Sequence, residues 1–233
     1  MFTDKTTARI VGALFIVATV TAIVGGALVV PMDGQDGLAE VADLRGQVVT
    51  GVLLEVVLAL SVVGIGVMIF PVLRRRNEGL ALGYAAARLL EAVLLLAASM
   101  SALVFVSLSR DHGTSGVDSL PALADVVRSS REWTYLFGSM VLLGVGGLIL
   151  YSLLLRSGLV PVWLSTWGLV GAGMILVRGV AEAYGVDLPV ALQALLALPI
   201  ALNEMVLAVW LIVRGFDDLD HAAEPTRQRV TAG

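Results

Sequence analysis

The chain contains no cysteine, and this absence removes several kinds of chemistry from consideration. Without a thiol there is no disulfide bond, no thiolate nucleophile and no cysteine-ligated metal. Histidine is scarce too, because the two histidines, His112 and His221, lie outside the long apolar runs described below. Haem held by two histidines and histidine-bound metals within a membrane are therefore excluded. The single lysine, Lys5, is too near the N-terminus to form a Schiff base inside a bundle.

Charge is also scarce, and this sets the class of protein. Charged residues make up 15% of the 233 residues, hydrophobic residues make up 58%, and the mean hydropathy is +0.93. Soluble domains are roughly 45–50% apolar and about 25% charged. We expect a multi-pass membrane protein whose first partner is the lipid bilayer and which has no nucleic-acid partner. Fourteen of the fifteen basic residues are arginine, which is typical of a GC-rich bacterial genome.

Long apolar runs predict the fold. Each reaches the roughly 20 residues that an α-helix needs to cross about 30 Å of hydrocarbon. The six runs cover about 9–30, 48–70, 80–108, 132–155, 161–183 and 189–213. We therefore predict an all-α bundle of six transmembrane helices over 1–216, with the first run retained as a helix rather than cleaved as a signal peptide. We predict a polar, disordered tail over 217–233.

The distribution of basic residues predicts the orientation of this bundle. Positive residues accumulate on the cytoplasmic side of membrane proteins. One side would hold nine of them: Lys5, Arg9, Arg74, Arg75, Arg76, Arg156, Arg214, Arg227 and Arg229. The other would hold four: Arg45, Arg110, Arg128 and Arg131. Both termini are thus predicted to be cytoplasmic, and the protein to lie in the inner membrane of a bacterial cell.

Two outer loops and the C-terminal tail can each be interpreted as functional or as purely structural. Leu38–Leu44 and Leu120–Val127 carry apolar residues at three- and four-residue spacing. Each segment is either an amphipathic helix that covers an outward opening or, as we favour, a loop packed on the end of the bundle. The acidic residues that follow Phe216 suit a solvated tail better than a metal site. We expect no metal and no other cofactor.

Ionisable side chains inside the apolar runs are the main functional signal. A charge at membrane depth costs roughly 2.5–3.5 kcal/mol on insertion scales, so such residues are rarely incidental. Six residues share this position: Glu55, Arg88, Glu91, Arg178, Glu182 and Glu204. The helical rise separates them into two layers. Arg88, Glu91 and Glu204 fall in the middle-to-inner layer, and Glu55, Arg178 and Glu182 fall in the outer layer.

Spacing and charge both bear on what these residues do. Arg88 and Glu91 are three residues apart, and Arg178 and Glu182 are four apart, so each pair shares one helix face. Two arginines against four glutamates leave a formal charge of −2, which a proton, a cation or water has to relieve. We interpret Arg178 and Glu182 as structural, and the inner layer as a ligand or proton site.

Two further residues extend the inner site along the last helix. Pro199 removes an intrahelical hydrogen bond one turn before Asn203 and Glu204, which would free carbonyl groups beside a carboxylate. The predicted ligand or proton site is therefore made of Glu55, Arg88, Glu91, Asn203 and Glu204.

Short motifs in the chain resemble a known family. They are Ala8–Phe15 in the first run, Leu54–Glu55, Arg88–Glu91, and the closing stretch Pro199–Phe216, which contains Glu204, Trp210 and Gly215. On these motifs, the chain resembles the bacterial membrane-protein family called domain of unknown function 4386 over nearly its whole length. The resemblance implies six membrane helices with polar positions at Glu55, Arg88, Glu91 and Glu204. It implies no activity.

Three functions remain open at this point. The first is a carrier or permease-like protein that binds a proton, a small cation or an amphiphile, with a homodimer as one arrangement that would suit so short a chain. The second is a sensor or accessory subunit, in which the buried charges are structural and the Arg74–Arg76 loop meets anionic lipid or a cytoplasmic protein. The third is an intramembrane enzyme acting on lipid, with glutamates as acid and base; we rank it last, and expect that the protein is not an enzyme.

Overall fold

The structure is a computed structural model that describes residues 4–33, 37–111 and 120–217. Within these ranges it is helical, with no strand. Six of its helical segments are long and apolar enough to cross a membrane. They are α1 (Asp4–Val29), α3 (Arg45–Leu73), α4 (Glu78–Asp111), the continuous segment Leu120–Ser157, α7 (Val162–Ala183) and α8 (Val190–Val213). The predicted all-α fold with six membrane-spanning helices is confirmed.

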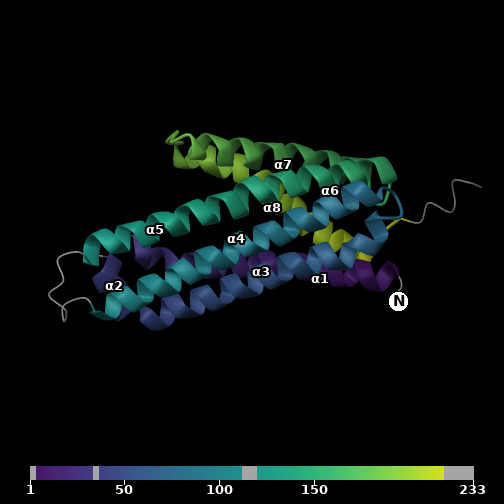
Figure 1. Ribbon diagram of the computed structural model, residues 1–233. Helices are drawn as coiled ribbons and strands as arrows, with labels where there is room; N and C mark the ends of the chain where they lie inside the picture. The colour runs from purple at the N-terminus through teal and green to yellow at the C-terminus, as the bar shows by residue number, and fades with distance from the viewer. Residues whose placement is uncertain (1–3, 34–36, 112–119, 218–233) are drawn as a thin grey trace, which may run out of the picture.

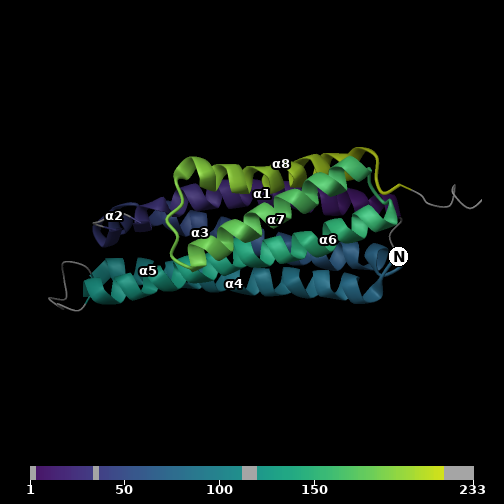
Figure 2. The ribbon, with the colours of Figure 1, turned by 90° about the horizontal axis from the view of Figure 1, so that it is seen from above.

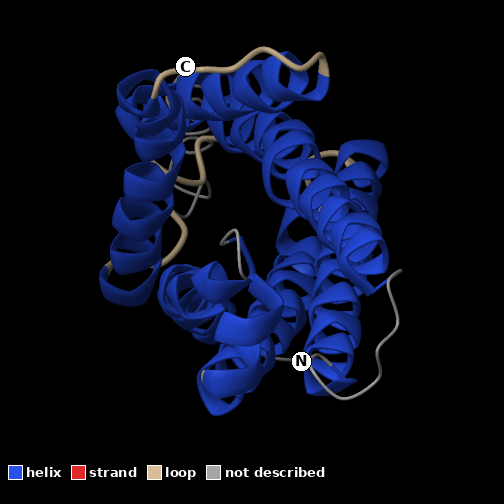
Figure 3. Ribbon diagram, turned by 90° about the vertical axis from the view of Figure 1, so that its left-hand side faces the viewer, coloured by secondary structure: helices blue, strands red, loops and turns tan. Residues whose placement is uncertain are grey.

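The six long segments form a closed ring. In sequence order each packs against the next, and α8 returns to pack against α1. Figure 3, viewed along the bundle, shows the helices surrounding a central region. α1 begins and α8 ends at the same end of the bundle (Figures 1 and 2), which we call the inner end; the opposite end is the outer end. That the inner end is cytoplasmic remains a prediction.

The fourth membrane segment differs most from its predicted form. It begins at Leu120 rather than near 132, as α5 (Leu120–Leu136), passes through the π-helical η2 (Phe137–Leu142) and continues as α6 (Leu143–Ser157). Leu120–Val127 is therefore not a separate surface segment. Its apolar residues belong to a helix that packs along α4, and Ala124 is buried between the two.

The outer end of the bundle extends well past α7 and α8. α4 has 34 residues and is about 51 Å long at 1.5 Å per residue, against roughly 30 Å of hydrocarbon. Figure 1 shows α3, α4 and α5 projecting beyond the outer ends of α7 and α8. The short helices η1 (Val30–Asp33) and α2 (Gly37–Asp43) lie at this end, where Leu38 and Val41 are buried. The segment around Leu38 thus packs on the end of the bundle, but as a short helix rather than the loop we favoured.

Two glycines let α8 approach its neighbours closely. A Cβ atom at Gly12 of α1 would lie 2.6 Å from the carbonyl oxygen of Ala208, and one at Gly171 of α7 would lie 2.8 Å from the backbone nitrogen of Ile200. Neither position has room for a side chain without moving backbone. α8 continues as a helix through Pro199. The two contacts hold α8 between α1 and α7, which fixes where Glu204 lies.

Candidate functional site

Arg88 is the centre of a buried polar cluster at the middle of the bundle. Its Nη1 lies 3.0 Å from Oε2 of Glu91, one turn further along α4, and its Nη2 lies 3.3 Å from Oε1 of Glu204 on α8. Its Nε donates a hydrogen bond of 2.9 Å to the hydroxyl of Tyr84. We call Tyr84, Arg88, Glu91 and Glu204 the Arg88 cluster. The structure thus brings together the three charged residues that depth counting placed in one layer.

The guanidinium of Arg88 is held on several sides. Its carbon lies 5.3 Å from the centre of the Tyr84 ring and 6.0 Å from that of Phe15 on α1. Such ring contacts attract a desolvated cation. The Arg88 side chain is 3% exposed. Two rings, a hydroxyl and two carboxylates surround the guanidinium of Arg88 and restrain its side chain in this conformation. Sequence reasoning missed Tyr84, although its position four residues before Arg88 on one helix face is a usable signal.

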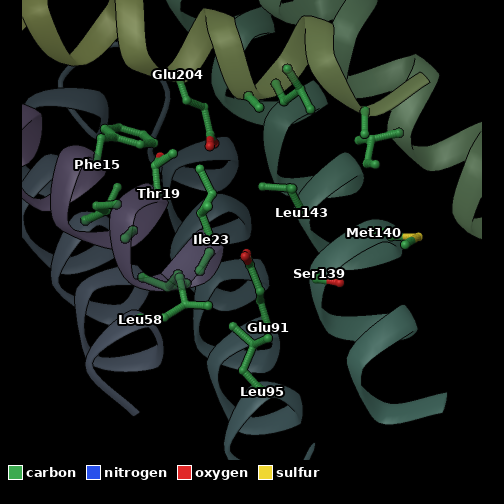
Figure 4. A pocket seen from close by; sticks show the side chains of 18 of the residues that line it. Phe15, Thr19, Ile23, Leu58, Glu91, Leu95, Ser139, Met140, Leu143 and Glu204 are labelled. Atoms are coloured by element: carbon green, nitrogen blue, oxygen red, sulfur yellow. The ribbon is translucent and has the colours of Figure 1, made fainter. Parts of the chain in front are cut away.

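A cavity of about 280 Å³ meets this cluster. Its walls come from every long segment of the ring and are mostly apolar. In Figure 4 the carboxylates of Glu91 and Glu204 point toward one another across it, with Ile23, Thr19 and Phe15 of α1 on one side. The polar groups on its walls are Thr19, Arg88, Glu91, Tyr135, Ser139, Arg178 and Glu204.

The cavity reaches the surface between α1 and α8. Ile23 and Ala201 both line it, yet Ile23 is 68% exposed and Ala201 is also exposed. Neighbouring residues on the same two helices, including Val20, Leu198 and Leu202, are apolar and about half exposed. A surface of this composition suits hydrocarbon rather than water. The opening therefore lies on a face of the bundle that lipid would cover.

Glu55 belongs to a different pair. Arg131 of α5 holds it with the two terminal nitrogen atoms of its guanidinium: Nη1 lies 3.0 Å from Oε2, and Nη2 donates to Oε1. The Ser99 hydroxyl donates to Oε2 at 3.2 Å, and Arg131 also donates to the carbonyl of Ala98 at 2.9 Å. Glu55 therefore neither contacts the Arg88 cluster nor lines its cavity, and its partner Arg131, which was counted with the outer-side residues, lies on the helix α5.

Arg178 and Glu182 form a third pair near the outer end of α7. The Nε of Arg178 lies 2.8 Å from the Glu182 carboxylate, and its other nitrogen atoms donate to the carbonyl and the side-chain oxygen of Gln193. The Gln193 amide in turn donates to the carbonyl of Leu188. This network ties α7 to the start of α8. Arg178 also lines the cavity.

These pairings correct the charge count. Arg131 joins Arg88 and Arg178, so three arginines face four glutamates and the formal charge is −1 rather than −2. The pair Arg131–Glu55 and the pair Arg178–Glu182 are each neutral. The excess negative charge therefore resides in the Arg88 cluster, where one guanidinium faces two carboxylates.

Asn203 does not join the cluster. Its amide nitrogen donates to the carbonyl of Leu164 on α7 at 2.9 Å, and its side chain is not among those lining the cavity. Residues 203 and 204 are consecutive on a helix and so point about 100° apart. With Glu204 turned to the cavity, Asn203 has to face α7. The structure therefore does not bring the two residues together at this cavity.

No metal site emerges from the described ranges, since no three His, Asp or Glu residues there are grouped to hold an ion. The tail residues Asp218, Asp220 and His221 lie outside the residues described.

Comparisons with known proteins give one finding. Searches of curated proteins and of solved structures found no match. A family model does match, over residues 10–215, which includes every residue of the Arg88 cluster and both neutral pairs. That span is most of the chain and agrees with the resemblance carried by the short motifs. The chain belongs to the family described as Domain of unknown function (DUF4386).

Proposed function

We infer that this protein is a carrier that binds a monovalent, amphiphilic organic cation in the central cavity and exchanges it for a proton. The observation that supports this most is the single excess carboxylate of the Arg88 cluster, which faces a mostly apolar cavity. An unpaired charge in such surroundings is costly, so a proton or a cation has to accompany it. Either one neutralises the cluster, and the two therefore compete for the same place.

The lining of the cavity indicates what kind of cation fits. A hard metal ion such as Ca²⁺ takes six to eight oxygen ligands. Besides Glu91 and Glu204, the walls offer the hydroxyls of Thr19, Tyr135 and Ser139, spread over two segments of the ring. Most of the remaining wall is aliphatic, with the Phe15 ring beside Arg88. Apolar walls with a few placed polar groups suit a small organic molecule.

The exchange balances as one charge for one charge. With the cavity empty, Glu91 and Glu204 share one proton, so the cluster is neutral. When a monovalent cation enters, that proton leaves and the cation takes its place beside the carboxylates. The ligand enters through the opening between α1 and α8, which an amphiphile dissolved in the bilayer reaches without crossing water.

Transport in proteoliposomes tests this proposal. Vesicles loaded with a pH-sensitive dye receive ethidium, a permanent aromatic cation, on one side. We expect ethidium uptake coupled to proton release, and a loss of at least tenfold in both rates for Glu204→Gln and for Glu91→Gln, since either change removes the excess charge. Glu132→Gln serves as the matched control, because Glu132 is exposed on α5 and does not line the cavity.

One result contradicts the carrier. If both variants transport at the parent rate while losing thermal stability, the Arg88 cluster is structural. That outcome would favour the second candidate, a non-catalytic sensor or accessory subunit. The observation that supports this candidate is the complete pairing of Arg131–Glu55 and Arg178–Glu182, which fasten helices without any unpaired charge.

A further inference from the structure

A second cavity lies at the inner end of the bundle and shares no lining residue with the cavity at the Arg88 cluster. It measures about 220 Å³ and is enclosed by the start of α4, the residues that precede it and the end of α6. Six residues line it: Arg76, Asn77, Leu80, Leu153, Arg156 and Ser157. Four of these side chains are polar and two are leucines. The cavity therefore has a polar mouth and an apolar wall.

Two arginines in this cavity lack a counter-charge among the described residues. Their neighbours at the inner end are occupied: Arg75 pairs with Asp4 at 2.8 Å, Arg74 lies over the Phe70 ring and Arg214 over the Trp210 ring. Arg76 and Arg156 have no such carboxylate or ring partner in the part of the chain that the structure describes. Two positive charges thus converge on one hollow.

The backbone beside these arginines also favours an anion. Asn77 precedes α4, and its side-chain oxygen accepts a hydrogen bond from the Leu80 amide at 2.9 Å. This leaves the amide groups of the first two residues of α4 without an intrahelical acceptor, at the positive end of a 34-residue helix. Glu78 is exposed and is not part of the cavity lining.

We propose that this cavity binds the negatively charged phosphate group of an anionic phospholipid through Arg76 and Arg156. Arginine forms paired hydrogen bonds to phosphate oxygens, and two arginines, one before α4 and one near the end of α6, can hold one phosphate between them. Leu80 and Leu153 supply an apolar wall against which the glycerol and first acyl carbons pack. A free phosphate ion would make no use of that wall. The site also lies at the end of the bundle predicted to face the cytoplasmic leaflet, which is rich in anionic lipid.

The test is binding of single lipids to the full chain in a neutral detergent, measured by native mass spectrometry. Phosphatidylglycerol is titrated against phosphatidylcholine and against inorganic phosphate. We expect the parent to retain one phosphatidylglycerol selectively, and the variant R76Q/R156Q to bind it at least tenfold more weakly, because two charge-assisted contacts are lost. The control variant R74Q/R214Q removes the same charge from ring-stacked arginines at the same end and should change the affinity less than threefold.

Three outcomes would overturn the proposal. Equal losses in R76Q/R156Q and R74Q/R214Q would mean that a diffuse surface potential attracts the lipid. If millimolar inorganic phosphate displaces bound phosphatidylglycerol as strongly as added phosphatidylglycerol does, the cavity binds a free phosphate ion rather than a lipid. A third outcome would assign the cavity to the chain's own acidic tail. The amide of Asp217 donates a hydrogen bond to the carbonyl of Leu159, three residues after Arg156, so the tail starts close to the cavity. Binding that appears only in the variant D218N/D220N would assign the cavity to this tail.

Discussion

Replacing Arg88 with glutamine should destabilise the protein by about 3–5 kcal/mol, the cost of leaving a buried charge without its partner. Arg88 is the single cation for Glu91 and Glu204, and its side chain is 3% exposed. Without it, two carboxylates face one another in an apolar cavity, and the Tyr84 hydroxyl loses the Nε donor. Unfolding of the purified protein in mixed micelles, followed by circular dichroism, measures the change.

A compensating variant separates charge from packing in this prediction. Glu91→Gln and Glu204→Gln combined with Arg88→Gln leave the cluster neutral, with nearly the same volume as in Arg88→Gln alone. We expect this triple variant to recover more than half of the lost stability while remaining inactive in transport. If the triple variant is as unstable as Arg88→Gln alone, the loss comes from packing against Phe15 and Tyr84 rather than from unpaired carboxylates.

Replacing Arg131 with glutamine should cost a similar amount, about 3–5 kcal/mol, because it strands the Glu55 carboxylate. Glu55 is 1% exposed, and the Ser99 hydroxyl is its other donor. The variant Glu55→Gln removes the charge instead, and the double variant removes both. A double-mutant cycle on unfolding free energies should give a coupling of about 1–3 kcal/mol in favour of the pair.

The same cycle also tests where function resides. Neither Glu55 nor Arg131 lines the central cavity, so the double variant should transport at nearly the parent rate once folded. Arg110→Gln, at an exposed position on α4, should change stability by no more than about 0.5 kcal/mol. A coupling near zero would mean that the Glu55–Arg131 pair does not form in the membrane. Loss of transport in a stable double variant would show that the functional site extends beyond the Arg88 cluster.

Hydropathy was enough to predict the six-helix bundle, because each apolar run has to become a helix to satisfy its backbone in lipid. It was not enough to find where the fourth helix begins. Leu120–Leu136 carries four charged residues and so falls below the hydropathy of a membrane helix, although it packs along α4 as part of a longer segment. Arg131 was consequently placed in a loop, and Glu55 was left without its partner.

The candidate site was predictable to the extent that helical geometry controls it. Rise per residue placed Arg88, Glu91 and Glu204 at one depth, and the i to i+3 spacing put the first two on one face. Depth says nothing about which face of α8 turns inward, so Asn203 and Glu204 were both assigned to the site although they diverge by about 100°. The cavity itself depends on how six helices are spaced around the ring, which no local pattern encodes.

Infrared spectroscopy of the protein in membranes tests the central claim most directly, because a protonated carboxyl group has a carbonyl stretch separate from that of a carboxylate. We predict one such band in the parent at neutral pH without ligand, and its loss when an amphiphilic cation such as ethidium binds. Glu91→Gln and Glu204→Gln should each abolish the band, since one remaining carboxylate balances Arg88. A parent protein whose buried carboxyl groups are all ionised in the absence of a cation would contradict the account.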